Sequence, residues 1–230
     1  MSGETGLRER KRQRMYRTIS ETAIALFLER GFDQVSVADV AAAAEVSKPT
    51  LFRYFPTKED LVLHRFADHE DEAARVVRGR PAGQSPLAAL HQHFLAGLER
   101  RDPITGLNDE AGVLAYQRLL YGTPSLVARL FEYISRSEEA LTMALTTAPR
   151  EAGEDGEDGA GGGPGGLTAP DDLAPRLAAG QISAVQRILG QDNWRRIEGG
   201  ASADEVHPSA VAAANRAFAM LRTGLAPYAG

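Results

Sequence analysis

The chain contains no cysteine. That absence excludes a disulfide framework, a cysteine zinc site and a thiol nucleophile together. No apolar run approaches the roughly 18 residues that a membrane-spanning helix needs. The amino terminus also lacks the apolar stretch of a signal peptide. These absences predict a cytoplasmic protein with no membrane partner.

Signals for strands and for catalysis are scarce as well. No stretch shows the alternation of apolar and polar residues that marks a half-buried strand, so we expect an all-α fold. The glycines after residue 151 lack the lysine and the strand of a phosphate-binding loop. His64 and His69 are five residues apart, and His91 and His93 are two apart, so neither pair shares a helix face as metal ligands would. We therefore expect no enzyme, no catalytic residue, no metal and no cofactor.

The charge is unevenly distributed. A net charge of -5 argues against a protein that coats nucleic acid along its whole surface. The amino-terminal run "RERKRQRMYR" is nevertheless strongly basic. It could lie along phosphates or enter a minor groove, or it could simply be a solvated tail. Its cationic residues are Arg8, Arg10, Lys11, Arg12, Arg14 and Arg17.

The first two predicted helices follow this basic arm. Apolar residues at helical spacing predict a helix over residues 18–30, and Gly31 follows where a left-handed residue often ends a helix. Ser36 and Asp39 form a capping box, which predicts a short, alanine-rich helix that begins near Val37.

Two more helices are predicted before residue 80. Ser47 caps a third helix over residues 48–54, which Pro56 ends. A Thr-x-x-Asp box at residues 57–60 begins a long, charged fourth helix that is predicted to reach Arg78.

The rest of the chain repeats the helical pattern. Residues 151–166 are glycine-rich and acidic, which predicts a disordered loop at about 150–168. The predicted domains are a head over residues 1–66 with its basic arm and a body over residues 67–230. The body helices are expected at 86–100, briefly after Pro103, and at 112–120, 124–145, 171–196 and 204–225.

The stretch "EVSKPTLFRYF", Glu45 to Phe55, carries the main functional signal. Two short helices joined by a tight turn, with a longer helix ahead of them, are the arrangement of a helix-turn-helix DNA reader. On the second short helix Leu51 and Phe55 lie four residues apart and share a face. That face is expected to pack on Phe27, Val40 and Val46.

The other residues of this helix have side chains that suit DNA. Lysine and arginine neutralise phosphates or bond to guanine, a threonine methyl can touch thymine, and a tyrosine hydroxyl can donate to phosphate. Lys58 comes one residue after a helix cap, where an anion is favoured. A solvated face is the alternative for such a helix, but the basic arm beside it favours DNA. The residues expected to face outward are Lys48, Thr50, Arg53 and Tyr54.

The segment "TISETAIALFLERGFDQVSVADVAAAAEVSKPTLFRYFPTKEDLV" resembles the DNA-binding domain of the TetR family of bacterial transcriptional regulators. The resemblance covers about Arg8 to Phe66. It implies that Lys48 and Thr50 approach bases and that Pro49 contacts the groove. The predicted DNA-contacting set is Arg17, Ser36, Val37, Ser47, Lys48, Pro49, Thr50, Phe52, Arg53, Tyr54 and Lys58.

Two residues depart from the family pattern. Phe52 stands where the family usually has a tyrosine, so only an apolar contact is implied there. Glu45 replaces the usual turn glycine, and a left-handed backbone at this position would cost about 1 kcal/mol.

The resemblance also implies a homodimer formed through the last two helices, which agrees with an apolar pattern on more than one side of residues 204–225. Trp194, Gly199-Gly200 and "AMLRTGL" are similar to the family branch with an acyl-CoA-like ligand-binding body. A small apolar or amphipathic effector is expected to shift the spacing of the two reader helices. The candidate effector-binding residues are Phe94, Leu98, Leu114, Tyr116, Leu120, Phe131 and Ile134.

The sequence therefore predicts a ligand-responsive repressor that binds a palindromic DNA operator as a dimer. The alternative is a helical, dimeric protein-interaction module without sequence-specific DNA binding. Salt dependence and base preference would separate the two functions.

Overall fold

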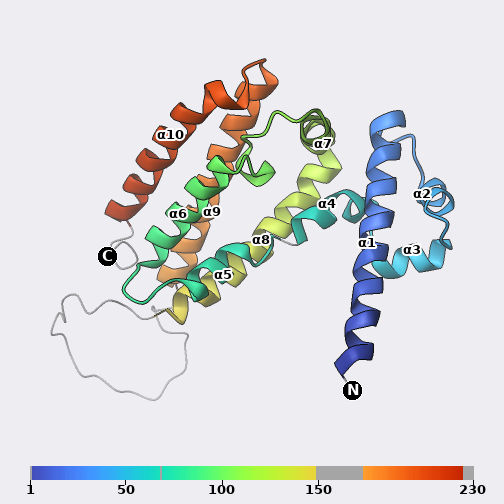
Figure 1. Ribbon diagram of the computed structural model, residues 1–230, viewed down its shortest axis with the longest axis horizontal. Helices are drawn as coiled ribbons and strands as arrows, with labels where there is room; N and C mark the ends of the chain where they lie inside the picture. The colour runs from blue at the N-terminus through green and yellow to red at the C-terminus, as the bar shows by residue number, and fades with distance from the viewer. Residues whose placement is uncertain (1, 68, 149–172, 225–230) are drawn as a thin grey trace. The chain divides into compact units, whose positions relative to one another are not determined.

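The computed structural model describes residues 2–67, 69–148 and 173–224, and in these ranges every regular element is a helix (Figure 1). The all-α prediction is confirmed. The predicted disordered loop at about 150–168 lies outside the described residues. None of the helices in the described ranges is long and apolar enough to cross a membrane.

The chain packs as two compact units. The first comprises residues 1–69 and 110–133, and the second comprises residues 70–109 and 134–230. The boundary between head and body predicted near residue 66 is thus close to the first division of the chain. The first unit also contains residues 110–133, which lie outside the head predicted from the sequence.

The first unit contains the predicted helix-turn-helix. Its helix α1 packs against three of the others, α2, α4 and α7. Helix α8 begins in this unit, and its residues from Ile134 onward belong to the second. The helices are α1 (Ser2–Arg30), α2 (Val37–Ala43), α3 (Lys48–Tyr54), α4 (Asp60–Ala67), α7 (Ala111–Gly122) and the start of α8 (Pro124–Thr146).

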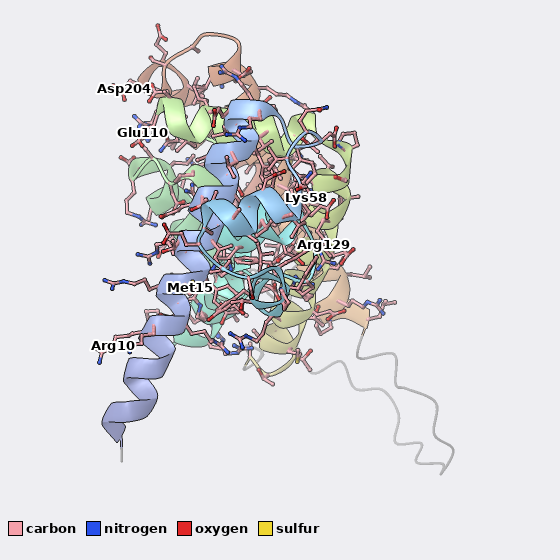
Figure 2. The ribbon with its side chains drawn as sticks, turned by 90° about the vertical axis from the view of Figure 1, so that its right-hand side faces the viewer. Arg10, Met15, Lys58, Glu110, Arg129 and Asp204 are labelled. Carbon is pink, nitrogen blue, oxygen red and sulfur yellow. The ribbon has the colours of Figure 1, made fainter. Side chains whose placement is uncertain are left out.

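Helix α1 is longer than predicted. It begins at Ser2 and not at Thr18, so the predicted basic arm is itself helical. Apolar spacing begins only at Ile19, but arginine, lysine, glutamine and methionine are good helix formers and no proline interrupts them. Figure 2 shows Arg10 and Met15 along this amino-terminal part of α1.

The predicted core of the first unit is confirmed. Phe27, Val40, Leu51 and Phe55 are all buried, and Val46 is half-buried. The two short helices α2 and α3 pack on each other. Leu51 and Phe55 therefore anchor α3, and burial of two such side chains stabilises the fold by about 3–6 kcal/mol relative to exposure.

The turn between α2 and α3 contains a left-handed glutamate. Glu45 has a φ of 55°, a region that side chains other than glycine populate at a cost. We expect Glu45→Gly to stabilise the protein by about 1 kcal/mol, because glycine adopts this φ without the Cβ clash. Thermal unfolding followed by circular dichroism would then show a higher midpoint. Glu45→Ala keeps the clash and is expected to leave the midpoint unchanged.

The long fourth helix predicted to reach Arg78 is wrong. Helix α4 ends at Ala67, and a separate helix α5 (Glu72–Gly79) follows. The intervening run "DHEDE" places like charges at neighbouring helical positions, which destabilises a continuous helix. Asp71 instead precedes α5 and accepts a hydrogen bond from Arg75 Nε at 2.9 Å.

The second unit is built on α6 and the two carboxyl-terminal helices, which lie side by side in Figure 1. Helix α10 packs against both α6 and α9, and α5 packs against α6. A short 3-10 turn, η1, contacts α6 and α9. Besides α5 and the later part of α8, the elements are α6 (Pro86–Glu99), η1 (Pro103–Thr105), α9 (Leu173–Glu198) and α10 (Ala203–Gly224).

The turn after η1 approaches α9 closely. Gly106 has a φ of 69°, and a Cβ at this position would lie 1.9 Å from the carbonyl oxygen of Gly190. Asn193 Nδ2 donates to the Thr105 carbonyl at 2.9 Å in the same contact. The two glycines thus allow the backbones of η1 and α9 to meet.

Candidate nucleic-acid interface

Helix α3 has the bounds and caps that its sequence predicts. The Ser47 hydroxyl accepts a hydrogen bond from the Thr50 backbone N–H at 3.2 Å and lies 2.8 Å from the Thr50 hydroxyl. At the other end the Phe55 N–H donates to the Leu51 carbonyl at 2.9 Å. A helix of seven residues is too short to be stable alone, so these caps and the buried face hold it in place.

The solvent side of α3 carries most of the predicted DNA-contacting residues. Lys48, Pro49 and Arg53 are exposed, and Thr50 is half-buried. The Phe52 ring is 43% exposed, which is unusual for a phenylalanine and suits a contact with a surface outside the chain. The structure brings these residues together on one short helix whose opposite face is core.

The start of α2 forms the predicted capping box. Ser36 Oγ accepts from the Asp39 N–H at 3.1 Å, and the Asp39 carboxylate accepts from the Ser36 N–H at 2.8 Å. Hydrogen bonds from the Ser36 hydroxyl and backbone hold the pKa of Asp39 below its usual range. Ser36 is exposed and Val37 is half-buried. Arg17 is exposed on α1.

Lys58 differs from the other predicted contacts. Its ammonium donates to the Phe32 carbonyl and lies 4.2 Å from the Phe32 ring centroid and 5.4 Å from that of Phe27. These internal contacts link the start of α4 to the end of α1. The phosphate contact of Lys58 stays a prediction, and it would compete with the bond to Phe32.

Tyr54 is half-buried and packs edge-on against Tyr16 of α1, with ring centroids 4.7 Å apart. Arg53 lies over the Tyr54 ring, with Cζ 5.7 Å from its centroid. Tyr16 was not predicted to take part, because the apolar spacing on α1 begins three residues later. The contact ties α3 to the amino-terminal part of α1.

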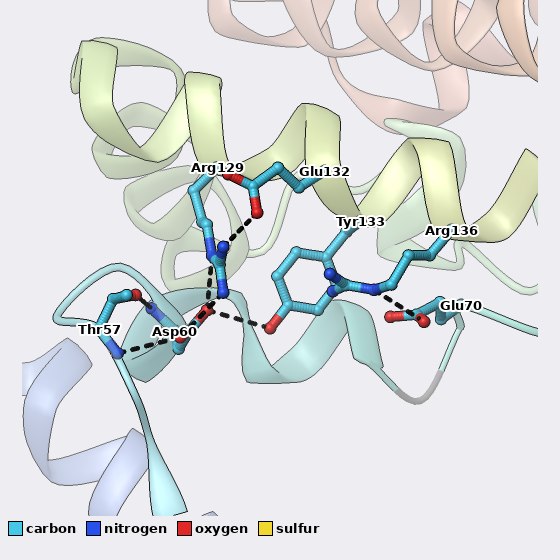
Figure 3. Close-up of polar contacts among 7 residues, drawn as sticks. All are labelled: Thr57, Asp60, Glu70, Arg129, Glu132, Tyr133 and Arg136. Atoms are coloured by element: carbon cyan, nitrogen blue, oxygen red, sulfur yellow. Dashed lines mark hydrogen bonds and ion pairs between the residues drawn. The ribbon is translucent and has the colours of Figure 1, made fainter. Parts of the chain in front are cut away.

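A charged network holds the start of α4 within the first unit (Figure 3). Asp60 is only 4% exposed, and Arg129 of α8 donates to both of its carboxylate oxygens, at 2.9 and 3.2 Å. The Thr57 N–H donates to the same carboxylate at 3.0 Å, and the Tyr133 hydroxyl lies at 3.4 Å. Arg129 also donates to Glu132.

The pKa of Asp60 reflects two opposed effects. Burial raises it, but the hydrogen bonds from Arg129 and Thr57 outweigh burial, so the pKa lies below its ordinary value. The same pair raises the pKa of Arg129, chiefly through the hydrogen bond to Asp60. Asp60 is therefore a buried carboxylate that is ionised and paired at neutral pH.

Within the second unit, Figure 3 shows one more ion pair of α8. Arg136 Nε donates to Glu70 Oε1 at 3.0 Å, just ahead of α5. The Glu70 side chain is 29% exposed and that of Arg136 is 41% exposed, so this pair is weaker than a buried one.

Comparison with known proteins agrees with this geometry. Residues 19–64 match the family described as bacterial regulatory proteins, tetR family. Over 195 residues the chain is 33% identical to the HTH-type transcriptional regulator TcmR of Streptomyces glaucescens, covering 84% of this chain and 79% of that protein. The chain belongs to the TetR family. It is a DNA-binding transcriptional regulator. Helix α3, the predicted reader helix, lies within the residues that match the family.

One further relative and one solved structure extend the comparison for this TetR-family chain. It is 28% identical to the HTH-type transcriptional repressor LfrR of Mycolicibacterium smegmatis, over 66% of this chain and 71% of that protein. The crystal structure of NalD, the secondary repressor of a multidrug efflux pump in Pseudomonas aeruginosa, superposes with a TM-score of 0.53 at 16% identity, over 90% of this chain and 96% of that one. The structural likeness establishes the shared fold alone.

The predicted effector-binding residues divide between the two units. In the second unit Phe94 and Leu98 are buried and Ile134 is half-buried. Four lie in the first unit, where Leu114 is half-buried, Tyr116 and Leu120 are buried, and Phe131 is 51% exposed. The Tyr116 hydroxyl donates to the Val62 carbonyl at 2.9 Å, and burial raises its pKa. These contacts make Tyr116 part of the core of the first unit.

A groove of about 450 Å³ lies elsewhere in the second unit. It runs between α8, at Glu138, and the start of α9, and none of the seven predicted residues lines it. Its lining residues are Glu138, Leu173, Arg176, Leu177, Gly180, Gln181 and Ala184. The effector site predicted from the sequence stays a prediction.

Proposed function

We propose that this TetR-family regulator is a repressor that binds a palindromic DNA operator as a homodimer in the cytoplasm. The observation that carries the proposal is α3, whose core face is buried while Lys48, Pro49 and Arg53 remain exposed. A two-fold dimer would present two such helices to successive major grooves, roughly 34–36 Å apart. LfrR is a repressor by name, which supports repression here.

Selection of bound sequences from random double-stranded DNA tests this proposal. The expected result is enrichment of an inverted repeat whose half-sites are separated by about one helical turn. Binding should weaken steeply with added salt, because each phosphate contact releases counterions. Enrichment of no sequence at all would favour the alternative of a protein-interaction module.

The dimer is proposed to form through α9 and α10. On α9 Leu173, Leu177 and Ile188 are 58%, 53% and 56% exposed and fall on one side of the helix, with Ala184 between them. On α10 Met220 is 75% exposed, whereas Ala210, Ala214, Phe218 and Leu221 are buried within the chain. Apolar side chains in a row are unusual on a free surface and typical of an interface.

Leu177→Asp should prevent dimer formation. Burial of an unpaired carboxylate in an apolar interface costs about 2–4 kcal/mol or more per copy, so the dimer dissociation constant should rise by at least 100-fold. Sedimentation at micromolar concentration measures it. Leu28→Asp makes the same change at an exposed leucine on α1 and should leave the protein dimeric. If the Leu177→Asp variant remains dimeric, α9 does not form part of the dimer interface.

Release from DNA is proposed to follow binding of a small apolar or amphipathic effector in the body. The effector must prefer one spacing of the reader helices, because equal affinity for both would shift nothing. Helix α4 ends at Ala67 and α5 begins at Glu72, so a change would pass from one helix to the next and not along one rigid helix.

A further inference from the structure

Tyr16 lies where three helices of the first unit meet. Its ring packs edge-on against Tyr54 and Phe55 at the end of α3, with centroids 4.7 and 5.3 Å away. It also stacks on His64 of α4 at 4.9 Å. Tyr16 is only half-buried, so this junction reaches the surface beside the reader helix.

Two arginines lie on the paired tyrosine rings. Arg12, one helical turn before Tyr16, has its Cζ 5.8 Å from the Tyr16 centroid. Arg53 of α3 has its Cζ 5.7 Å from the Tyr54 centroid. Each exposed cation-π contact contributes about 0.5–1 kcal/mol, so the guanidinium group prefers a position over the ring. The edge-on contact of the two rings therefore links the position of Arg12 on α1 to that of Arg53 on α3.

The arrangement suits a run of phosphates. Each strand of B-DNA carries a phosphate about every 3.4 Å along the helix axis, and the planar guanidinium binds phosphate through two parallel N–H donors. Arg12 and Arg53 come from different helices, so their relative placement depends on the rings between them. Leu51 and Phe55 alone would fix the core face of α3 without fixing Tyr54.

We propose that Tyr16 is a positioning residue for DNA binding and that Arg12 is a further phosphate contact. Tyr16 holds Tyr54, and through it Arg53, and it also carries Arg12. This inference rests on the proposed operator binding. It adds to the predicted basic arm a specific phosphate contact for Arg12 and a residue, Tyr16, that holds it; both lie ahead of residue 19, where the family model begins to match.

The test uses the full chain and the DNA duplex that the wild-type protein enriches from random sequence, with affinity measured over a range of KCl concentrations. Arg12→Gln should make the slope of log affinity against log salt shallower by about 2, one phosphate for each subunit of a dimer. Tyr16→Leu should change the slope by at least as much and lower affinity by 10-fold or more at about 0.15 M salt. Tyr16→Phe keeps the ring and should match the wild type.

The controls separate positioning from other roles. Arg78→Gln removes one exposed charge on α5 and should leave the slope unchanged. A wild-type slope in Tyr16→Leu would overturn the inference, and so would a Tyr16→Phe variant as weak as Tyr16→Leu, since the hydroxyl would then contact DNA directly. If Tyr16→Leu fails to fold, Arg12→Gln still tests the inference. A wild-type salt slope in that variant would show that Arg12 does not contact a phosphate. Failure of the wild-type protein to enrich any sequence would overturn operator binding itself.

Discussion

Arg129→Met is expected to destabilise the first unit by about 2–3 kcal/mol, because it leaves a buried carboxylate without its charged partner. The Asp60 side chain is 6% exposed and that of Arg129 is 25% exposed, so water can replace little of the lost interaction. Two hydrogen bonds from the guanidinium are lost together, whereas the Thr57 N–H remains. Thermal unfolding should show a midpoint lower by about 5–10 °C.

The loss should depend on pH. In the wild-type protein the pKa of Asp60 is lowered, so its contribution to stability is present above pH 4 and is lost as the pH falls through the folded-state pKa. In Arg129→Met burial still raises the pKa while the opposing hydrogen bonds from Arg129 are gone. The carboxyl of the variant therefore takes up a proton at a higher pH than that of the wild type, so the difference in stability should shrink as the pH falls.

A double variant provides the matched control. Asp60→Leu together with Arg129→Met removes both charges and should recover part of the stability lost in Arg129→Met, because no unpaired charge stays buried. Equal midpoints for wild type and Arg129→Met would contradict the buried pair.

Lys48→Ala combined with Thr50→Ala should abolish selective DNA binding. A good base contact is worth about 1–3 kcal/mol, and a dimer loses each contact twice, so affinity for the operator should fall by about 30-fold or more. Lys48 is exposed and Thr50 is half-buried, so the fold should be nearly unaffected. Binding titrations with operator and scrambled duplexes measure both affinity and preference.

Single variants assign the contacts. Thr50→Val keeps the methyl group and removes the hydroxyl, so it separates apolar contact with thymine from hydrogen bonding. Arg78→Gln should bind like the wild type. An unchanged affinity and base preference in the double alanine variant would show that α3 is not the reader.

The parts of the head set by local interactions were predictable from the sequence. The caps at Ser36 and Ser47 and the stop at Pro56 act within four residues, so the bounds of α3 and the start of α2 follow from the sequence itself. A left-handed backbone at Glu45 was raised only as a condition, from the glycine that the family usually has there, and the φ of 55° meets that condition.

The contacts that depend on distant residues were not predictable. The Thr-x-x-Asp pattern indicates a capping box of Thr57 and Asp60, but nothing in the sequence shows that Arg129, 69 positions after Asp60, also binds this carboxylate. Tyr16 lies in a segment whose composition indicates only charge, and its partners come from two other helices. Lys58 was expected to face phosphate because of its helix end, whereas a nearby carbonyl and two rings hold it inward.

The meeting of Gly106 and Gly190 limits how the second unit can change during evolution. Any other residue at position 106 would have a strained, left-handed φ. Its Cβ would also clash with the backbone oxygen of Gly190, which cannot move without displacing α9. Apolar side chains elsewhere in the unit can change more freely, because volume-conserving exchanges are well tolerated. We therefore expect the pair of glycines to persist among close descendants of this chain whose other core residues have diverged.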